Sequence, residues 1–172
     1  MSRGKEYAAR PLATEYPMSF QINALPMSDF EPLLTLSEAD LAARNMRRVV
    51  ADGHPVYPCR VSLQDAMEGE EVLLLSYAHH EVATPYCASG PIYVRRTAIQ
   101  ARPARNEVPQ LLRARELSLR GYDRRGMMVW AEVVPGSEVE QGIERLFALA
   151  RTGYLHIHYA RPGCYACRVD RA

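Results

Sequence analysis

The sequence predicts a single α+β domain with a largely antiparallel sheet of about seven or eight short strands and two main helices. The first observation behind this prediction is that strand-like segments occur in runs and do not alternate strictly with helices. The second is that the end of the chain has the pattern of a β-hairpin. The third is size, because 172 residues, 48% of them hydrophobic and 24% charged, suffice for one full core.

The first 17 residues differ from the rest of the chain. They are polar and patternless, whereas the segment after Met18 alternates like a first strand. We therefore expect residues 1–17 to be a dispensable N-terminal extension, either disordered or upstream of a true start at Met18, and residues 18–172 to form the domain. The start lacks the apolar region of a signal peptide, and no later stretch reaches the ~18 to 20 apolar residues needed to cross a bilayer. These features predict a cytoplasmic protein without a membrane partner.

Hydrophobic alternation, capping residues and turn residues define a series of short elements before residue 115. In chain order these are a strand over 19–25, a helix from Ser37 to about Arg44, strands over 46–52 and 59–63, a central strand over 72–78, a loop carrying His79 and His80, a strand over 92–96, a loop over 99–107 and a short helix from Pro109 to about Ala114. The central position of residues 72–78 follows from their sequence, VLLLSYA, which is the most apolar run in the chain.

The next segment predicts a hairpin and a helix. Residues 116–123 and 127–134 alternate on either side of a turn that contains Gly126. Ser137, followed three residues later by Glu140, has capping-box spacing for an amphipathic helix that we expect to end at Gly153.

Reactive side chains are densest between Tyr154 and Ala172. This segment alternates on both sides of the turn sequence Arg161-Pro162-Gly163, which predicts a hairpin with a three-residue loop. The expected opposed pairs are Ala160 with Cys164, His158 with Ala166 and His156 with Arg168. The first face then carries His156, His158, Cys164, Arg168 and Asp170, and the apolar face carries Ile157, Tyr159, Tyr165, Cys167 and Val169.

Two arginines suggest a binding site for a small anion. The triplet Cys-Arg-Val occurs around Arg60 and again around Arg168. If these two segments are neighbouring strands, Arg60 joins Arg168, His156 and His158 on one surface. Arginine presents a rigid fork that matches carboxylate or phosphate, so we prefer this surface as the site of a small anionic ligand or substrate. His156 or His158 is the candidate general base, because an imidazole near pH 7 both takes and gives a proton.

Other functions stay open beside the anion site. Zinc binding is the main alternative, because H-x-H and C-x-x-C are ligand spacings, and its expected ligands are His156, His158, Cys164 and Cys167. It is less favoured because C-x-x-C sites need a tight turn between the cysteines, whereas Tyr165 and Ala166 look extended. Two histidines with a carboxylate, Asp170 being nearest, form a further possible metal set.

Cys164 is also a candidate nucleophile activated by a histidine. In a non-enzymatic structural or interaction protein, the histidines would instead stand on a solvated sheet face beside an Arg168–Asp170 ion pair. Without an export signal, the four cysteines are expected to be reduced thiols or metal ligands. A formal net charge of +1 gives no reason to expect nucleic acid as a partner, and a homo-oligomer remains open.

Several blocks of sequence together resemble a known family. They are PCRVSLQDA over 58–66, PYCASGPIYVR over 85–95, LSLRGYD over 117–123 and HIHYARPGCYACRVDR over 156–171. In order and spacing they are similar to the domain-of-unknown-function 1203 family of small bacterial proteins, and the resemblance covers roughly Met18 to the end. The resemblance implies no activity, substrate or cofactor, so it assigns no role to any residue.

Overall fold

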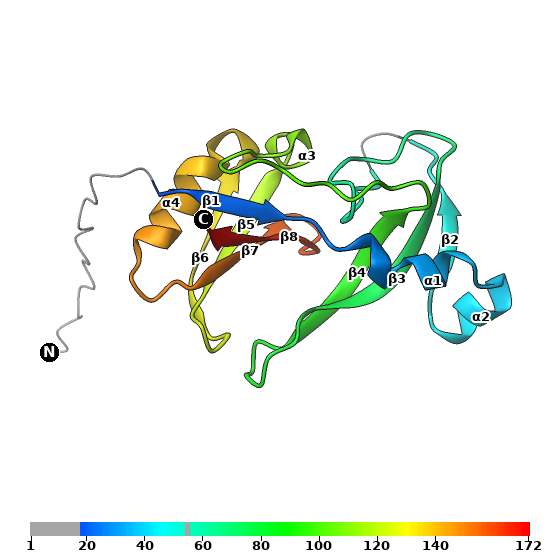
Figure 1. The fold of residues 1–172 in the computed structure, drawn as a ribbon, viewed down its shortest axis with the longest axis horizontal. Coiled ribbons are helices and arrows are strands. Elements are labelled where there is room, and N and C mark those ends of the chain that lie inside the picture. The colour runs from blue at the N-terminus through cyan, green and yellow to red at the C-terminus, as the bar shows by residue number, and fades with distance from the viewer. Residues whose placement is uncertain (1–17, 54–55) are drawn as a thin grey trace, which may run out of the picture.

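The computed structural model describes residues 18–53 and 56–172 (Figure 1). The expected extension over residues 1–17 lies outside the described residues. As predicted, the described part is an α+β domain with eight strands, all paired antiparallel in two sheets. The strands are β1 (Phe20–Asn23), β2 (Arg47–Val50), β3 (Glu71–His80), β4 (Ala88–Arg95), β5 (Glu116–Tyr122), β6 (Met128–Pro135), β7 (Tyr154–Tyr159) and β8 (Tyr165–Arg171). The helices are η1 (Met27–Asp29), α1 (Glu31–Leu34), α2 (Glu38–Ala43), α3 (Gln110–Arg113), η2 (Gly136–Glu138) and α4 (Val139–Ala148). No helix among these combines the length and apolar character required to cross a bilayer.

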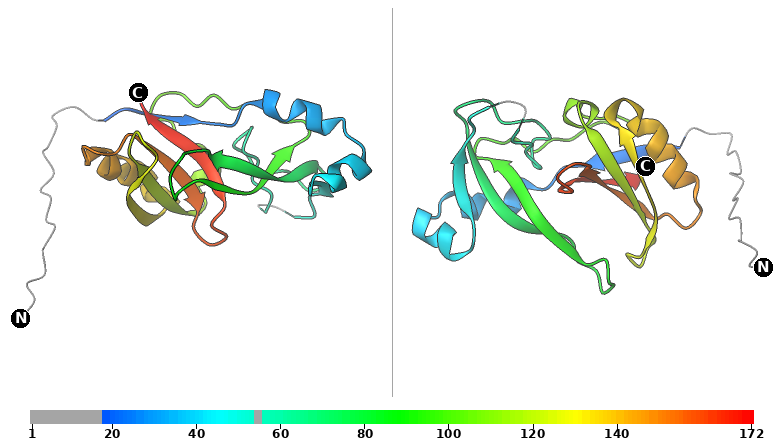
Figure 2. Two further views of the ribbon diagram at one scale, coloured as in Figure 1. Left: turned by 90° about the horizontal axis from the view of Figure 1, so that it is seen from below. Right: turned by 180° about the vertical axis from the view of Figure 1, so that it is seen from behind.

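The larger sheet has five strands in the order β1-β8-β7-β5-β6. β7 lies at its centre, and every residue of β7 is buried. α4 packs on one face of this sheet (Figures 1 and 2), where its Ile143 and Leu146 join Ile157 in the main core. Because alternate residues of a strand point to opposite faces, His156 and His158 face away from α4.

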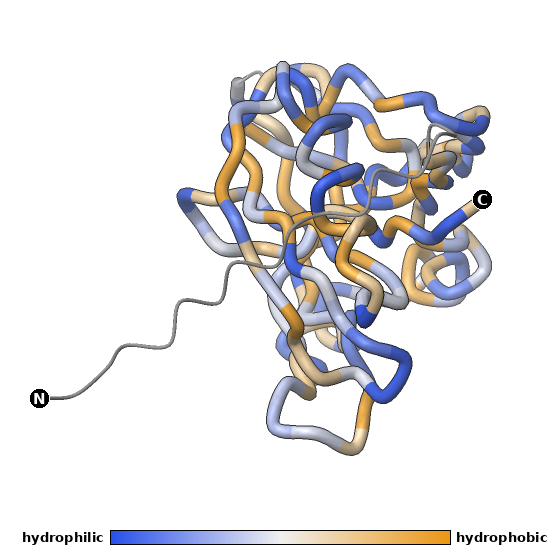
Figure 3. Tube along the Cα trace, turned by 90° about the vertical axis from the view of Figure 1, so that its left-hand side faces the viewer, coloured by the Kyte–Doolittle hydropathy of each residue, from blue (hydrophilic) through white to orange (hydrophobic). Residues whose placement is uncertain are grey.

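The smaller sheet has the order β2-β3-β4, so the most apolar run of the chain is its central strand, as predicted. Figure 3 shows hydrophobic and hydrophilic residues interspersed along the Cα trace. Leu73, Leu75 and Ile92 form the core of this sheet together with Tyr165, which comes from β8 of the larger sheet. Tyr165 therefore links the two halves of the domain.

The β3–β4 and β5–β6 hairpins project in the same direction (Figures 1 and 2), and a hydrogen bond joins their turns. The hydroxyl of Thr84 donates a hydrogen bond to the carbonyl of Gly126 at 3.2 Å. Gly126 has a φ of +83°, and a Cβ added there would lie 2.7 Å from a methyl carbon of Val82. This contact holds the end of β3 beside the face of the larger sheet that α4 leaves free.

Several local predictions are confirmed. The hydroxyl of Ser37 caps α2 by accepting a hydrogen bond from the backbone N–H of Asp40 at 3.1 Å. Pro109 immediately precedes α3, and Gly126 lies in the turn between β5 and β6. Capping and turn chemistry depend on residues close in sequence, which is why these signals could be recognised.

Three local predictions are wrong. Residues 59–63 are not a strand, because only isolated bridges form at Pro58 and Cys59 before the chain turns. Ser137 does not cap α4, which starts after η2 with no side-chain cap. The carboxylate of Glu140 pairs instead with Arg113 on α3. α4 ends at Ala148 and not at Gly153, because the next residue already has an extended backbone.

Candidate metal centre

Three histidines converge between the two sheets. His156 and His158 come from β7, and His79 comes from the end of β3. Each ring offers one nitrogen, and the three offered atoms all lie within 4.8 Å of one another. These residues are the one group of three or more potential metal ligands that the described part of the chain brings together.

Each of the three rings has a buried nitrogen without a hydrogen-bond partner among the described residues. His156 is 2% exposed and His158 is 1% exposed. Nδ1 of His79, Nδ1 of His156 and Nε2 of His158 are buried without a hydrogen-bond partner among the described residues. A buried polar atom left unpaired costs about 1 to 3 kcal/mol, so three of them in one place require an explanation.

The tautomer of His158 is fixed by its other nitrogen. Nδ1 lies 2.9 Å from the carbonyl oxygen of Gly163 in the β7–β8 turn, and a carbonyl accepts but does not donate. Nδ1 therefore carries the proton, and Nε2 presents a lone pair to the cluster. A backbone carbonyl commonly orients a metal-binding histidine in this way.

His80 lies next to the cluster but is fully occupied. Its Nδ1–H donates to the carbonyl of Tyr86 at 2.7 Å, so its Nε2 accepts from the hydroxyl of Tyr154 at 2.7 Å. Its ring packs edge-on against His156 at 4.9 Å between centroids. His80 thus supports the cluster without offering a free nitrogen.

Register shifts in the strands bring these side chains together. β3 shifts register between Tyr77 and His80, where it carries one more residue than β4. β8 shifts register opposite His158, which pairs with Tyr165 instead of Ala166. An extra residue in one strand redirects the side chains that follow, and such bulges are frequent beside functional sites.

The bulge in β8 corrects the predicted hairpin. The pairing of His156 with Arg168 is confirmed, but the expected pairing of His158 with Ala166 is wrong. As a result, Tyr165 does not lie on the apolar face with Ile157. Its ring stacks on His79 with 4.8 Å between centroids and an angle of 5° between planes.

Burial keeps the histidines uncharged. It lowers the pKa of His156 to about 2, with a further contribution from the nearby His80. It also lowers the pKa of His158 to about 3 and that of His79 to about 4. At neutral pH all three rings are therefore neutral, which is the form that binds metal ions.

The two arginines proposed for an anion site are both engaged elsewhere. Arg168 forms three hydrogen bonds with the carboxylate of Asp170, the shortest at 2.7 Å, and its guanidinium lies 4.0 Å from the centre of the Tyr154 ring. Arg60 is 2% exposed, and it donates to the carbonyls of Tyr165 and Pro58. The expectation that Arg60 lies on a shared surface with the histidines is wrong, because its segment is a buried turn and not a neighbouring strand.

The cysteines do not join the histidines. Cys167 is completely buried in the main core with Ile157 and Tyr159, as predicted. The thiol of Cys164 makes a long contact of 3.8 Å with the carbonyl of Pro162, and within the described residues it has no hydrogen bond to a histidine. Neither cysteine belongs to the ligand group, so the expected four-ligand set is not assembled.

Sequence reasoning missed His79 and His80, which it assigned to a loop. β3 continues through both residues. The available signal was compositional, because two of the five histidines are adjacent and two others form H-x-H. The register shift in β3, which brings these histidines close to β7, could not be predicted from the sequence.

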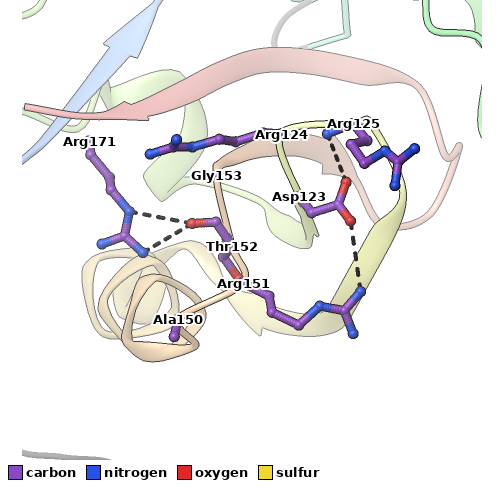
Figure 4. Close-up of a pocket in the computed structure, with 8 residues that line it drawn as sticks. All are labelled: Asp123, Arg124, Arg125, Ala150, Arg151, Thr152, Gly153 and Arg171. Carbon is purple, nitrogen blue, oxygen red and sulfur yellow. Dashed lines mark hydrogen bonds and ion pairs between the residues drawn. The ribbon is translucent and has the colours of Figure 1, made fainter.

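A second candidate site is a surface pocket of about 440 Å³ (Figure 4). It is lined by Asp123, Arg124, Arg125, Ala150, Arg151, Thr152, Gly153 and Arg171. Arg171 is committed to backbone carbonyls, including that of Thr152 at 3.0 Å, and Arg151 lies 3.7 Å from the carboxylate of Asp123. Arg124 and Arg125 are exposed. These arginines form a solvated surface, so the histidine cluster is the stronger candidate.

The fold and site define a small α+β domain with a three-histidine cluster between two antiparallel sheets, in which His156 and His158 are buried and His79 is partly buried. Residues 56–171 match the family described as "Protein of unknown function (DUF1203)". The protein therefore belongs to this family, and all four blocks quoted for the resemblance lie inside the matched residues. The match begins after Met18, where the resemblance was expected to start. No curated protein and no solved structure matches the chain.

Proposed function

We propose that this protein binds a transition-metal dication such as Zn²⁺ through His79, His156 and His158. The observation that carries the proposal is the convergence of three neutral rings, each with a buried nitrogen that has no partner among the described residues. A bound ion would satisfy all three nitrogens at once. With bonds of about 2.1 Å in a tetrahedral site, the ligand atoms would be drawn to about 3.4 Å apart.

The low pKa values favour ligation over proton transfer. A general base works best with a pKa near the working pH, whereas His156 and His158 have pKa values of about 2 and about 3. Zinc ions in structural sites usually have four protein ligands, and those in catalytic sites have three with one position for water or substrate. The three-histidine set corresponds to the second type.

Zn²⁺ titration of the chelator-stripped full-length protein tests this proposal. Calorimetry and metal analysis should find one equivalent bound, and His158→Gln should weaken binding by roughly 100-fold or more because a direct ligand is lost. His80→Gln is the matched control, since His80 is adjacent and buried but has both nitrogens engaged. Circular dichroism would establish that both variants fold. Failure of the wild type to bind, or equal weakening in both variants, would contradict the proposal.

A further inference from the structure

Arg120 lies beside the histidine cluster on the larger sheet. It belongs to β5 and stands directly opposite His156 on β7, and Ser118 stands opposite His158. Opposed residues on antiparallel strands share a face, with Cβ atoms about 4.5 to 5.5 Å apart. The Nε–H of Arg120 donates to the hydroxyl of Ser118 at 3.4 Å, which directs the guanidinium along the histidine face.

The charge of Arg120 is not neutralised by a carboxylate. Within the described residues it forms no ion pair, in contrast to Arg168, which is bound to Asp170. Burial is the main cause of the lowered pKa values of His79 and His158, and the charge of Arg120 contributes to both. The half-buried guanidinium therefore acts on the cluster electrostatically.

A metal ion at this site would leave a large unbalanced charge. Three neutral imidazoles and a dication carry two positive charges, Arg120 adds a third, and the ligand group contains no carboxylate. Partly buried charges are costly unless they are paired. His156 and Arg120 lie on one face of the larger sheet, and the guanidinium has no carboxylate partner among the described residues, so a single anion beside the ion could compensate both positive charges.

We propose that the fourth position binds a small oxyanion, a carboxylate or a phosphate, with one oxygen on the metal and a second accepting hydrogen bonds from Arg120. This inference rests on the proposed metal site and names its ligand class. The planar guanidinium fork suits an anion with two oxygens on one central atom. Arg120 thus takes the anion-binding role for which the sequence had suggested Arg60 and Arg168.

The test uses the full-length protein loaded with Co²⁺, whose visible absorption spectrum reports changes in coordination. Titration with sodium acetate and with inorganic phosphate should change the spectrum and give a dissociation constant for each anion. Arg120→Gln should weaken the binding of at least one anion by roughly tenfold or more, because charged hydrogen bonds are lost. Arg105→Gln, at an exposed arginine in a distant loop, should leave both constants unchanged. Arg105→Gln should also leave the affinity for Co²⁺ unchanged, and Arg120→Gln should not weaken it, because loss of a nearby positive charge lowers the repulsion of a dication.

The outcomes separate the two proposals. Failure of the wild type to bind Co²⁺ or Zn²⁺ would refute the metal site and this inference with it. Metal binding without a spectral response to either anion, or with equal responses in Arg120→Gln and wild type, would refute the inference alone. If Arg120→Gln does not fold, Arg120→Lys decides the matter, because it keeps the charge but loses the fork. Anion affinity equal to wild type in that variant would overturn the role of the guanidinium.

Discussion

Mild acid should destabilise the metal-free protein, because two histidines are buried without charge. Burial lowers the pKa of His156 to about 2 and that of His158 to about 3, whereas histidine in an unfolded chain has a pKa of about 6.5. Below pH 6.5 the unfolded state therefore binds more protons than the folded state. The contribution of the two neutral rings to the free energy of unfolding is fully present above about pH 6.5. It is lost progressively as the pH falls toward the pKa values of the folded state.

The expected loss is large compared with the stability of a typical domain. At pH 5 each histidine of the unfolded chain is about 1.5 pH units below its pKa. Proton binding therefore stabilises the unfolded state by about 2 kcal/mol per ring. His156 and His158 together then lower the free energy of unfolding by about 4 kcal/mol, whereas the whole free energy of unfolding of a domain is usually about 5 to 15 kcal/mol. His79 acts in the same direction, with a pKa lowered to about 4, but its partial exposure reduces its share.

Urea unfolding at pH 7.5, 6.5, 5.5 and 5.0, with a chelator present, measures this loss. The free energy of unfolding should stay level from pH 7.5 to about 7 and then fall steadily. His156→Gln removes one of the buried titrating rings, so its difference between pH 7.5 and pH 5.0 should be smaller than that of wild type by about 2 kcal/mol. An unfolding free energy that is the same at pH 7.5 and pH 5.0 in the wild type would refute the reasoning.

Two further predictions concern packing. Gly136→Ala should lower the unfolding free energy by about 3 kcal/mol or more, because the added Cβ would lie 2.2 Å from the backbone oxygen of Leu112, whereas Gly90→Ala meets nothing within 4 Å and serves as the control in the same urea assay. Equal stability of the two variants would contradict this. Cys167 should resist a thiol reagent at pH 8 in the native protein while Cys164 reacts, because Cys167 is fully buried and burial raises its pKa to about 12. Equal labelling rates at Cys164 and Cys167 would show that β8 does not pack as described.

The sequence alone located half of the candidate site. His156 and His158 were correctly placed on the face of the hairpin opposite Ile157, because a strand has a period of two and Ile157 belongs to an apolar set. The position of the hairpin turn was also correct, with Gly163 at a φ of +74°. These features depend on neighbours within a few residues, and local patterns report them well. The expected pairing of Ala160 with Cys164 is wrong, because the backbone N–H of Tyr159 donates to the carbonyl of Cys164 at 2.9 Å and that of Ala160 donates to Glu116 on β5.

The rest of the site depends on contacts between distant segments. His79 approaches β7 only because β3 shifts its register and because the two hairpin tips meet at Gly126. The bulge in β8 redirected Tyr165, and strict alternation cannot reveal an inserted residue. Arg60 was expected on a strand surface, but it is buried where its turn packs against the carbonyl of Tyr165.

The three candidate ligands come from two different sheets, and this would link the stability of the folded protein to the supply of metal. The sheets share no backbone ladder among the described strands, so an ion held by His79, His156 and His158 would join them through their side chains. A ligand that binds only the folded form adds about 2.7 kcal/mol of stability when its free concentration is 100 times its dissociation constant. The folded population would then depend on the availability of the metal, and loss of the metal would raise the unfolded population that proteases cleave.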